Sequence, residues 1–189
     1  MVALTFGTVF VLVNSGGLPA PWPLVIRVIG LLVAALLVVA LVLVVRRGSS
    51  VAPGPVPGFV DRRYWVIVSL EAGALFGGLA VLNGVLHGEA VSVAWVALIV
   101  GVHFFGLARI WRMPLFHWLG TAIAILSLAG FLIYALGGSA AMVGLVSGVG
   151  SGAALYAAVG VAVGDALLGR AGGDLRVTQV DPGAEHRGP

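Results

Sequence analysis

The hydrophobic pattern of the chain alternates between long apolar runs and short segments rich in Gly, Pro and Arg. Six runs consist mainly of Val, Leu, Ile, Ala and Gly: residues 2–13, 24–45, 64–86, 91–108, 115–136 and 140–168. These runs are continuous and lack the apolar–polar alternation of the strands in a membrane β-barrel. Because about 20 apolar residues are enough for a helix to cross a bilayer, the pattern predicts an all-α, polytopic transmembrane helical bundle with six spans.

The first apolar run is shorter than the other five. Residues 2–13 fall below the roughly 17 residues that a span requires. A signal peptide is the rival interpretation, but the segment lacks a basic start and the LPAP that follows is a poor cleavage site. We therefore expect a retained helix, which gives six spans if it crosses the membrane and five if it does not.

Two further segments define the domain organisation. Residues 48–60, with the sequence GSSVAPGPVPGFV, form a Pro- and Gly-rich linker, a composition that favours extended and flexible chain. Residues 169–189 are polar with mixed charge, which predicts a loosely ordered tail. We expect one transmembrane bundle over residues 1–168, with the linker and the tail both in the cytoplasm.

Composition agrees with a membrane protein and excludes several kinds of site. The chain is 60% hydrophobic and 9% charged, whereas soluble domains carry about 25% charged residues. It has no Cys, so disulfides, iron–sulfur clusters and thiolate zinc sites are excluded. No nucleophile–base motif, phosphate-binding loop or nucleotide fingerprint is present. We therefore expect neither an enzyme nor a cofactor.

The arginines predict the orientation of the bundle. All ten basic residues are Arg, and they are scattered over short loops instead of forming the basic face that nucleic-acid binding needs. Six alternating spans place nine of them on one side: Arg46, Arg47, Arg62, Arg63, Arg109, Arg112 and three in the tail. The opposite side has only Glu89 and, just inside a helix, Arg27, which we expect to extend to the headgroups. By the positive-inside rule the Arg-rich side and both termini are cytoplasmic.

A polar layer is expected near this cytoplasmic side. Residues 101–120, GVHFFGLARIWRMPLFHWLG, form a charged elbow with a His on each flank. Counted from the nearest helix end at 1.5 Å per residue, four titratable residues on four helices lie roughly 7–10 Å deep: Glu71, His103, His117 and Asp165. Ionisable groups inside a membrane are costly and usually face the bundle interior or a water-filled cavity.

Three interpretations of this layer remain open. In the first, Glu71 and His103 are a titrating pair on adjacent antiparallel helices, and Asp165 and His117 line the cytoplasmic mouth of an ion or proton pathway. In the second, the four side chains bind a metal, although no local ligand motif such as HExxH is present. In the third, His117 and Asp165 reach water at the interface and Glu71 bonds to a neighbouring helix.

Glycines recur at intervals of four residues in two of the predicted helices. The last helix carries Gly144, Gly148, Gly152, Gly160 and Gly164, and a shorter ridge consists of Ser69, Gly73 and Gly77. Such spacing, typical of a glycine zipper, lets helix backbones approach closely in lipid. The ridges predict contacts either between helices of one chain or across a homodimer.

The elbow HFFGLARIWRMPLFHWLG and the earlier segment FGTVFVLVNSG resemble small multi-pass membrane proteins of GC-rich bacteria. The resemblance covers the elbow and the first hairpin. It implies a location in the bacterial inner membrane, and because the family has no assigned activity, it assigns no role to any residue of this chain.

Two classes of function follow from these patterns. The first is a small permease-like or ion-coupled membrane protein with a small-molecule or ion substrate. The alternative is a non-catalytic scaffold or partner subunit that associates with itself or with another membrane protein through its glycine ridges. A membrane-embedded metal-dependent enzyme is a more distant third. In each case the surrounding partner is membrane lipid.

Overall fold

The computed structural model describes residues 2–46, 62–111 and 113–177, and all the secondary structure in them is helical. The predicted linker over residues 48–60 lies outside the described residues, as do Arg47 and Arg112. The α-helices are α1 (Val2–Asn14), α2 (Trp22–Arg46), α3 (Arg62–Gly84), α4 (Ser92–Trp111), α5 (Pro114–Ala135), α6 (Ala140–Val143) and α7 (Gly150–Val177). A 3₁₀ turn, η2 (Glu89–Val91), precedes α4, and a π-helical stretch, η3 (Gly144–Val149), joins α6 to α7.

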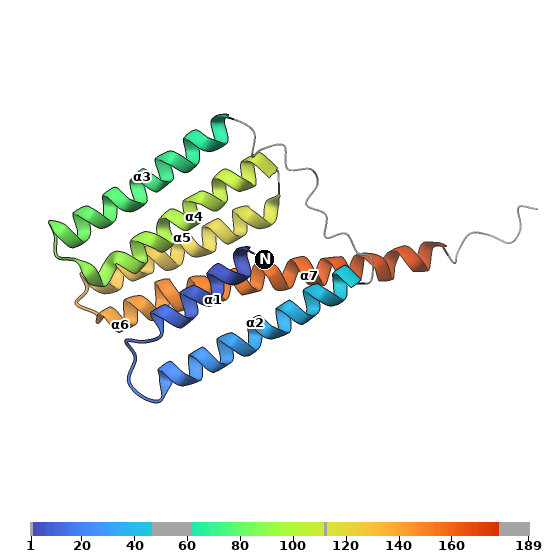
Figure 1. The fold of residues 1–189 in the computed structure, drawn as a ribbon, viewed down its shortest axis with the longest axis horizontal. Coiled ribbons are helices and arrows are strands. Elements are labelled where there is room, and N and C mark those ends of the chain that lie inside the picture. The colour runs from blue at the N-terminus through green and yellow to red at the C-terminus, as the bar shows by residue number, and fades with distance from the viewer. Residues whose placement is uncertain (1, 47–61, 112, 178–189) are drawn as a thin grey trace, which may run out of the picture.

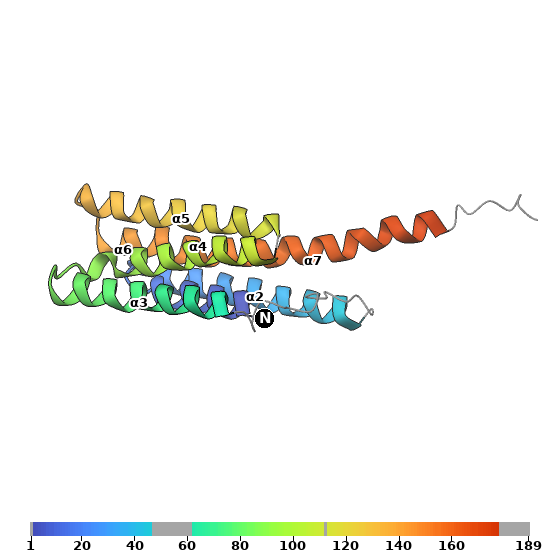
Figure 2. The same ribbon diagram turned by 90° about the horizontal axis from the view of Figure 1, so that it is seen from above.

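The long helices lie side by side, and consecutive helices run in opposite directions (Figure 1). The turns between α1 and α2, between α3 and α4, and between α5 and α6 lie toward one end of the bundle. Seen from above, α7 continues past the other helices (Figure 2). This arrangement confirms the prediction of an all-α bundle.

Four helices are long and apolar enough to cross a membrane: Trp22–Arg46, Glu89–Trp111, Pro114–Ala135 and Ala140–Leu167. The α1 helix has 13 residues, and the apolar part of α3 is the shorter stretch Val68–Gly84. The structure is therefore that of a helical membrane protein. Whether α1 crosses, which decides between six spans and five, stays a prediction, and so does the crossing of α3.

Local sequence explains where α5 and α6 begin. Pro114 occupies the first turn of α5, where its fixed φ fits the helix and its missing N–H is not needed. After α5 ends, Gly137 adopts a φ of +82°, a conformation that glycine adopts at no steric cost. Ser139 then caps α6, its hydroxyl accepting a hydrogen bond from the Met142 N–H at 3.3 Å.

The last helix is longer than predicted, because α7 continues to Val177 instead of ending at residue 168. Extending an existing helix adds one hydrogen bond for each residue fixed, so polar composition alone does not end it. The first proline after Leu168 is Pro182, too far along to interrupt this segment. Residues 178–189 of the predicted tail lie outside the described residues.

The arginines of the described helix ends lie toward the same end of the bundle. Arg46 and Arg109 occupy the last turns of α2 and α4, and Arg62 begins α3; these three helix ends lie opposite the turns named above (Figure 1). Cations in a last turn are favourable beside the partial negative charge of the helix C-terminus. Which membrane side this end faces stays a prediction.

The short α1 helix lies at the centre of the bundle. Two clusters of buried residues form the core, and α1 contributes to both. The first cluster joins α1 to α4, α5 and α7 through Phe10, Ala97, Phe104, Leu119, Ile123 and Leu155. The second joins α1 to α2 and α7 through Leu4, Val11, Ala34 and Tyr156.

Glycine positions set the closest helix contacts. A β-carbon on Gly152 of α7 would lie 2.8 Å from the carbonyl oxygen of Gly7 on α1 and 2.7 Å from a methyl group of Val11. One on Gly148 would collide with Asn14, and one on Gly144 would lie 3.1 Å from the Asn14 carbonyl oxygen. These three glycines thus face α1 of the same chain.

The second half of the α7 glycine ridge is different. A β-carbon on Gly160 would reach only Leu37, at 3.8 Å, and one on Gly164 would meet nothing within 4 Å. A further close crossing, not among the predicted ridges, joins α4 to α5, where a β-carbon on Gly120 would lie 2.9 Å from the Gly101 carbonyl oxygen.

We predict that Gly152→Ala destabilises the bundle and that Gly164→Ala does not. The added methyl group has no space at position 152 but has open space at position 164, and overpacking typically costs about 1–3 kcal/mol. Both variants gain the same helix propensity, so their difference in thermal unfolding in detergent isolates the α1–α7 contact. Equal melting temperatures would contradict the close crossing.

Candidate functional site at the α3–α4 interface

A carboxylate and an imidazole meet between α3 and α4. Nδ1 of His103 lies 2.6 Å from Oε2 of Glu71, and the two side chains are 34% and 16% exposed. At this distance two lone pairs would repel each other, so one of the two atoms carries a proton that the other accepts. The contact is thus a charge-assisted hydrogen bond or an ion pair, depending on where the protons lie.

The hairpin connection brings these two residues together. The helices α3 and α4 are antiparallel neighbours joined by a short turn and η2. Next to the turn, the Ser92 hydroxyl donates a hydrogen bond to the Asn83 side-chain oxygen at 2.6 Å. Glu71 lies twelve residues before Asn83 on α3, and His103 lies eleven residues after Ser92 on α4. The same register therefore places Glu71 opposite His103. Matched depth on antiparallel helices therefore predicts this proximity.

Between the two polar contacts, an indole holds the helices together. Nε1 of Trp95 donates a hydrogen bond to the backbone carbonyl oxygen of Ala74 at 3.2 Å. The indole lies over Gly78, where any β-carbon would collide with it. A backbone carbonyl inside a helix already accepts one hydrogen bond, and its second lone pair is available for such a donor.

The packing of α3 differs from that of α4. The helix packs mainly against α4, and none of its described side chains is buried. By contrast, α4 buries five residues: Ala94, Ala97, Gly101, Phe104 and Ala108. The hydrogen bonds at Glu71, Ala74 and Asn83 thus attach to α4 a helix whose described side chains are all at least partly exposed.

The other two residues of the predicted polar layer lie apart from this pair. His117 is exposed on α5, with its ring edge-on to Phe105 at a centroid distance of 6.2 Å. Asp165 is exposed on α7. In the described part of the chain, no three His, Asp or Glu residues are grouped so that they could hold a metal ion. Equal depth does not bring side chains together when they point in different directions around their helix axes.

The structure assigns Arg27 a contact that the sequence did not predict. Its Nε donates hydrogen bonds to the carbonyl oxygen of Leu12 at 3.2 Å and to the hydroxyl of Ser15 at 3.1 Å. The guanidinium therefore caps the C-terminus of α1, where the helix dipole favours a cation. In the sequence, the only indication of this contact is a single Arg near the start of the helix that follows the first turn.

A row of buried serines is the second feature that sequence reasoning missed. Ser127 and Ser147 donate hydrogen bonds to the carbonyl oxygens of Ile123 and Leu126, at 2.7 and 3.0 Å. Ser151, also buried, has no hydrogen-bond partner for its hydroxyl among the described residues. These serines adjoin or belong to η3, and π-helical stretches often occur near functional positions.

We predict an energetic coupling between Glu71 and His103. In a double-mutant cycle with Glu71→Ala and His103→Ala, the sum of the two single losses of unfolding free energy should exceed the loss in the double variant. The expected difference is roughly 0.5–3 kcal/mol, the range for residues in direct contact. Thermal unfolding in detergent measures each corner of the cycle. Additive effects would show that the contact contributes nothing to stability.

Comparison with known proteins found no relative of this chain. The chain matches no protein-family model, and neither a curated protein nor a solved structure shows significant similarity to it.

Proposed function

We propose that the protein is a small permease-like or proton- or ion-coupled membrane protein, in which Glu71 and His103 are the titrating pair. The supporting observation is the 2.6 Å contact between the two side chains, on helices of a membrane bundle. Paired ionisable groups at such positions are typical of proton relays and ion pathways.

The chemistry of the pair suits a coupling role. With a single proton held between Nδ1 and Oε2, the pair carries a net charge of −1. The remaining ring nitrogen, Nε2, has a lone pair that can accept a second proton. The pair then becomes neutral overall. A change of one unit of charge is costly in a medium of low dielectric constant, so it can alter the position of a neighbouring helix.

The α3 helix is the element that such a change would move. It buries none of its described side chains and is joined to α4 by hydrogen bonds, one of which belongs to the pair itself. A full ion pair in the doubly protonated state would hold α3 against α4. In the other neutral tautomer, with the single ring proton on Nε2, the Nδ1 lone pair would face the carboxylate and the contact would weaken.

The proposed setting is the bacterial inner membrane, with the Arg-bearing end of the bundle in the cytoplasm. This orientation places Glu71 and His103 near the cytoplasmic face, where His117 and Asp165, both exposed, would line the mouth of the pathway. No catalytic role is part of this proposal.

We predict that Glu71→Gln abolishes pH-dependent ion movement while leaving thermal stability nearly unchanged. The amide oxygen of Gln can still accept a hydrogen bond from Nδ1–H, but the amide cannot exchange a proton. The measurement uses sealed vesicles containing the purified protein, a pH-sensitive dye inside them and an imposed potassium or sodium gradient. Glu89→Gln in the exposed turn before α4 is the matched control.

Two outcomes would contradict this function. Wild-type vesicles with no flux above empty vesicles under any of the gradients would remove it altogether. Equal flux in the Glu71→Gln and Glu89→Gln variants would show that the pair is structural.

The second candidate function is that of a partner subunit, and the open face of α3 favours it. β-Carbons on Gly73 and Gly77 would meet nothing within 4 Å, so this small-residue ridge is available to another helix. The first half of the α7 ridge, at Gly144, Gly148 and Gly152, is already occupied by α1.

We predict that, if α3 binds a second transmembrane helix, Gly77→Leu disperses the complex and Gly164→Leu does not. Both positions have open space around them, so neither substitution should disturb the fold of the single chain. Native mass spectrometry of the protein from mild detergent gives the oligomeric state. A complex that survives Gly77→Leu would exclude this ridge as the interface.

A further inference from the structure

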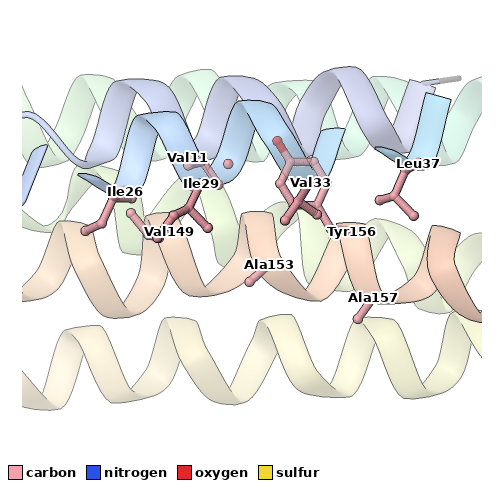
Figure 3. A pocket seen from close by; sticks show the side chains of 10 residues that line it. Val11, Ile26, Ile29, Val33, Leu37, Val149, Ala153, Tyr156 and Ala157 are labelled. Carbon is pink, nitrogen blue, oxygen red and sulfur yellow. The ribbon is translucent and has the colours of Figure 1, made fainter. Parts of the chain in front are cut away.

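A groove on the surface of the bundle runs between α2 and α7, with a volume of about 450 Å³ (Figure 3). This size is within the ~300–1,000 Å³ range of pockets that bind small molecules. Its α2 wall presents Ile26, Ile29, Val33 and Leu37. Gly30 also belongs to this wall, and the other lining residues, from η3, α7 and α1, are apolar apart from the hydroxyl of one tyrosine.

The floor of the groove is closed by a tyrosine that has its own partner. The hydroxyl of Tyr156 donates a hydrogen bond to Thr8 at 2.9 Å, so it is turned toward α1. Opposite α2, the wall on α7 consists of the small side chains Ala153 and Ala157 (Figure 3). The groove therefore suits a flexible hydrocarbon chain and offers no polar group to a hydrophilic ligand.

The length of the groove corresponds to one leaflet. Ile26 and Leu37 lie at its two ends (Figure 3). At 1.5 Å per residue this part of α2 rises about 16 Å, which is close to half of the ~30 Å hydrocarbon core. The groove thus begins near the headgroups and ends near the middle of the bilayer.

A cation stands at the headgroup end. Arg27 follows Ile26 on α2, and its Nε contacts the carbonyl oxygen of Leu12, the residue after the groove-lining Val11. Arg27 is exposed and forms no ion pair in the described part of the chain. The Nε hydrogen bonds leave the two terminal nitrogens of the guanidinium, and a guanidinium matches the geometry of a phosphate.

From this juxtaposition we propose that the groove binds one molecule of an anionic phospholipid. One acyl chain occupies the apolar groove between α2 and α7, and the headgroup phosphate contacts the guanidinium of Arg27. The apolar lining and leaflet length select an acyl chain, and the unpaired cation selects a lipid with net negative charge. This site is separate from the Glu71–His103 pair and does not depend on the function proposed for it.

The test is native mass spectrometry of the full chain, after incubation in detergent with equal amounts of phosphatidylglycerol and phosphatidylcholine that carry identical acyl chains. One Arg near an anionic headgroup is worth about 1 kcal/mol, so we expect roughly a fivefold preference for phosphatidylglycerol. Ala153→Phe should fill the groove and reduce binding of both lipids. Ala35→Phe is the matched control, because Ala35 is exposed on α2 and does not line the groove.

Substitutions of Arg27 test the headgroup contact. Arg27→Gln should abolish the preference, whereas Arg27→Lys should retain most of it because the charge remains. Equal lipid binding by the Ala153→Phe and Ala35→Phe variants would overturn the proposal, as would an undiminished preference in Arg27→Gln. A dimer of the wild type that Ala153→Phe dissociates would also overturn it, since a second copy would then occupy the groove.

Discussion

Direct contact between helix backbones at glycine is the interaction on which the bundle depends. Lipid tails are as apolar as leucine, so helices in a bilayer gain little from burying hydrophobic side chains against one another. They associate through close contact between backbones, which is possible where a glycine has no side chain. Gly7 against Gly152 brings α1 onto α7, and Gly101 against Gly120 brings α4 onto α5. Through the first crossing, a helix of 13 residues becomes the central element of both buried clusters.

The α3 helix is held in a different way. It has no glycine crossing of this kind toward α4; its Gly78 instead makes room for the indole of Trp95. Hydrogen bonds at Glu71, Ala74 and Asn83, with Trp95 donating to Ala74 and Ser92 to Asn83, replace backbone contact. Attachment through polar groups can respond to protonation, whereas attachment through van der Waals contact cannot. The same difference leaves Gly73 and Gly77 uncovered, so both proposed functions depend on the one loosely packed helix.

Much of this architecture could be predicted from the sequence. The helices begin and end close to the predicted positions, because Pro114, Gly137 and Ser139 have strong local preferences. The proximity of Glu71 and His103 follows from hairpin register, which is also local. The α7 helix continues beyond the apolar run to Val177, because helix propagation does not require apolar residues.

The sequence by itself determined the membrane class, the helical segments and the position of each polar residue along its helix, since each residue adds about 1.5 Å along the helix axis. Only the tertiary structure decided which way each helix faces. That rotation is set by contacts with segments distant in the chain, and it separates His117 and Asp165 from the Glu71–His103 pair. It also turns Arg27 onto the end of α1 and opens the groove between α2 and α7.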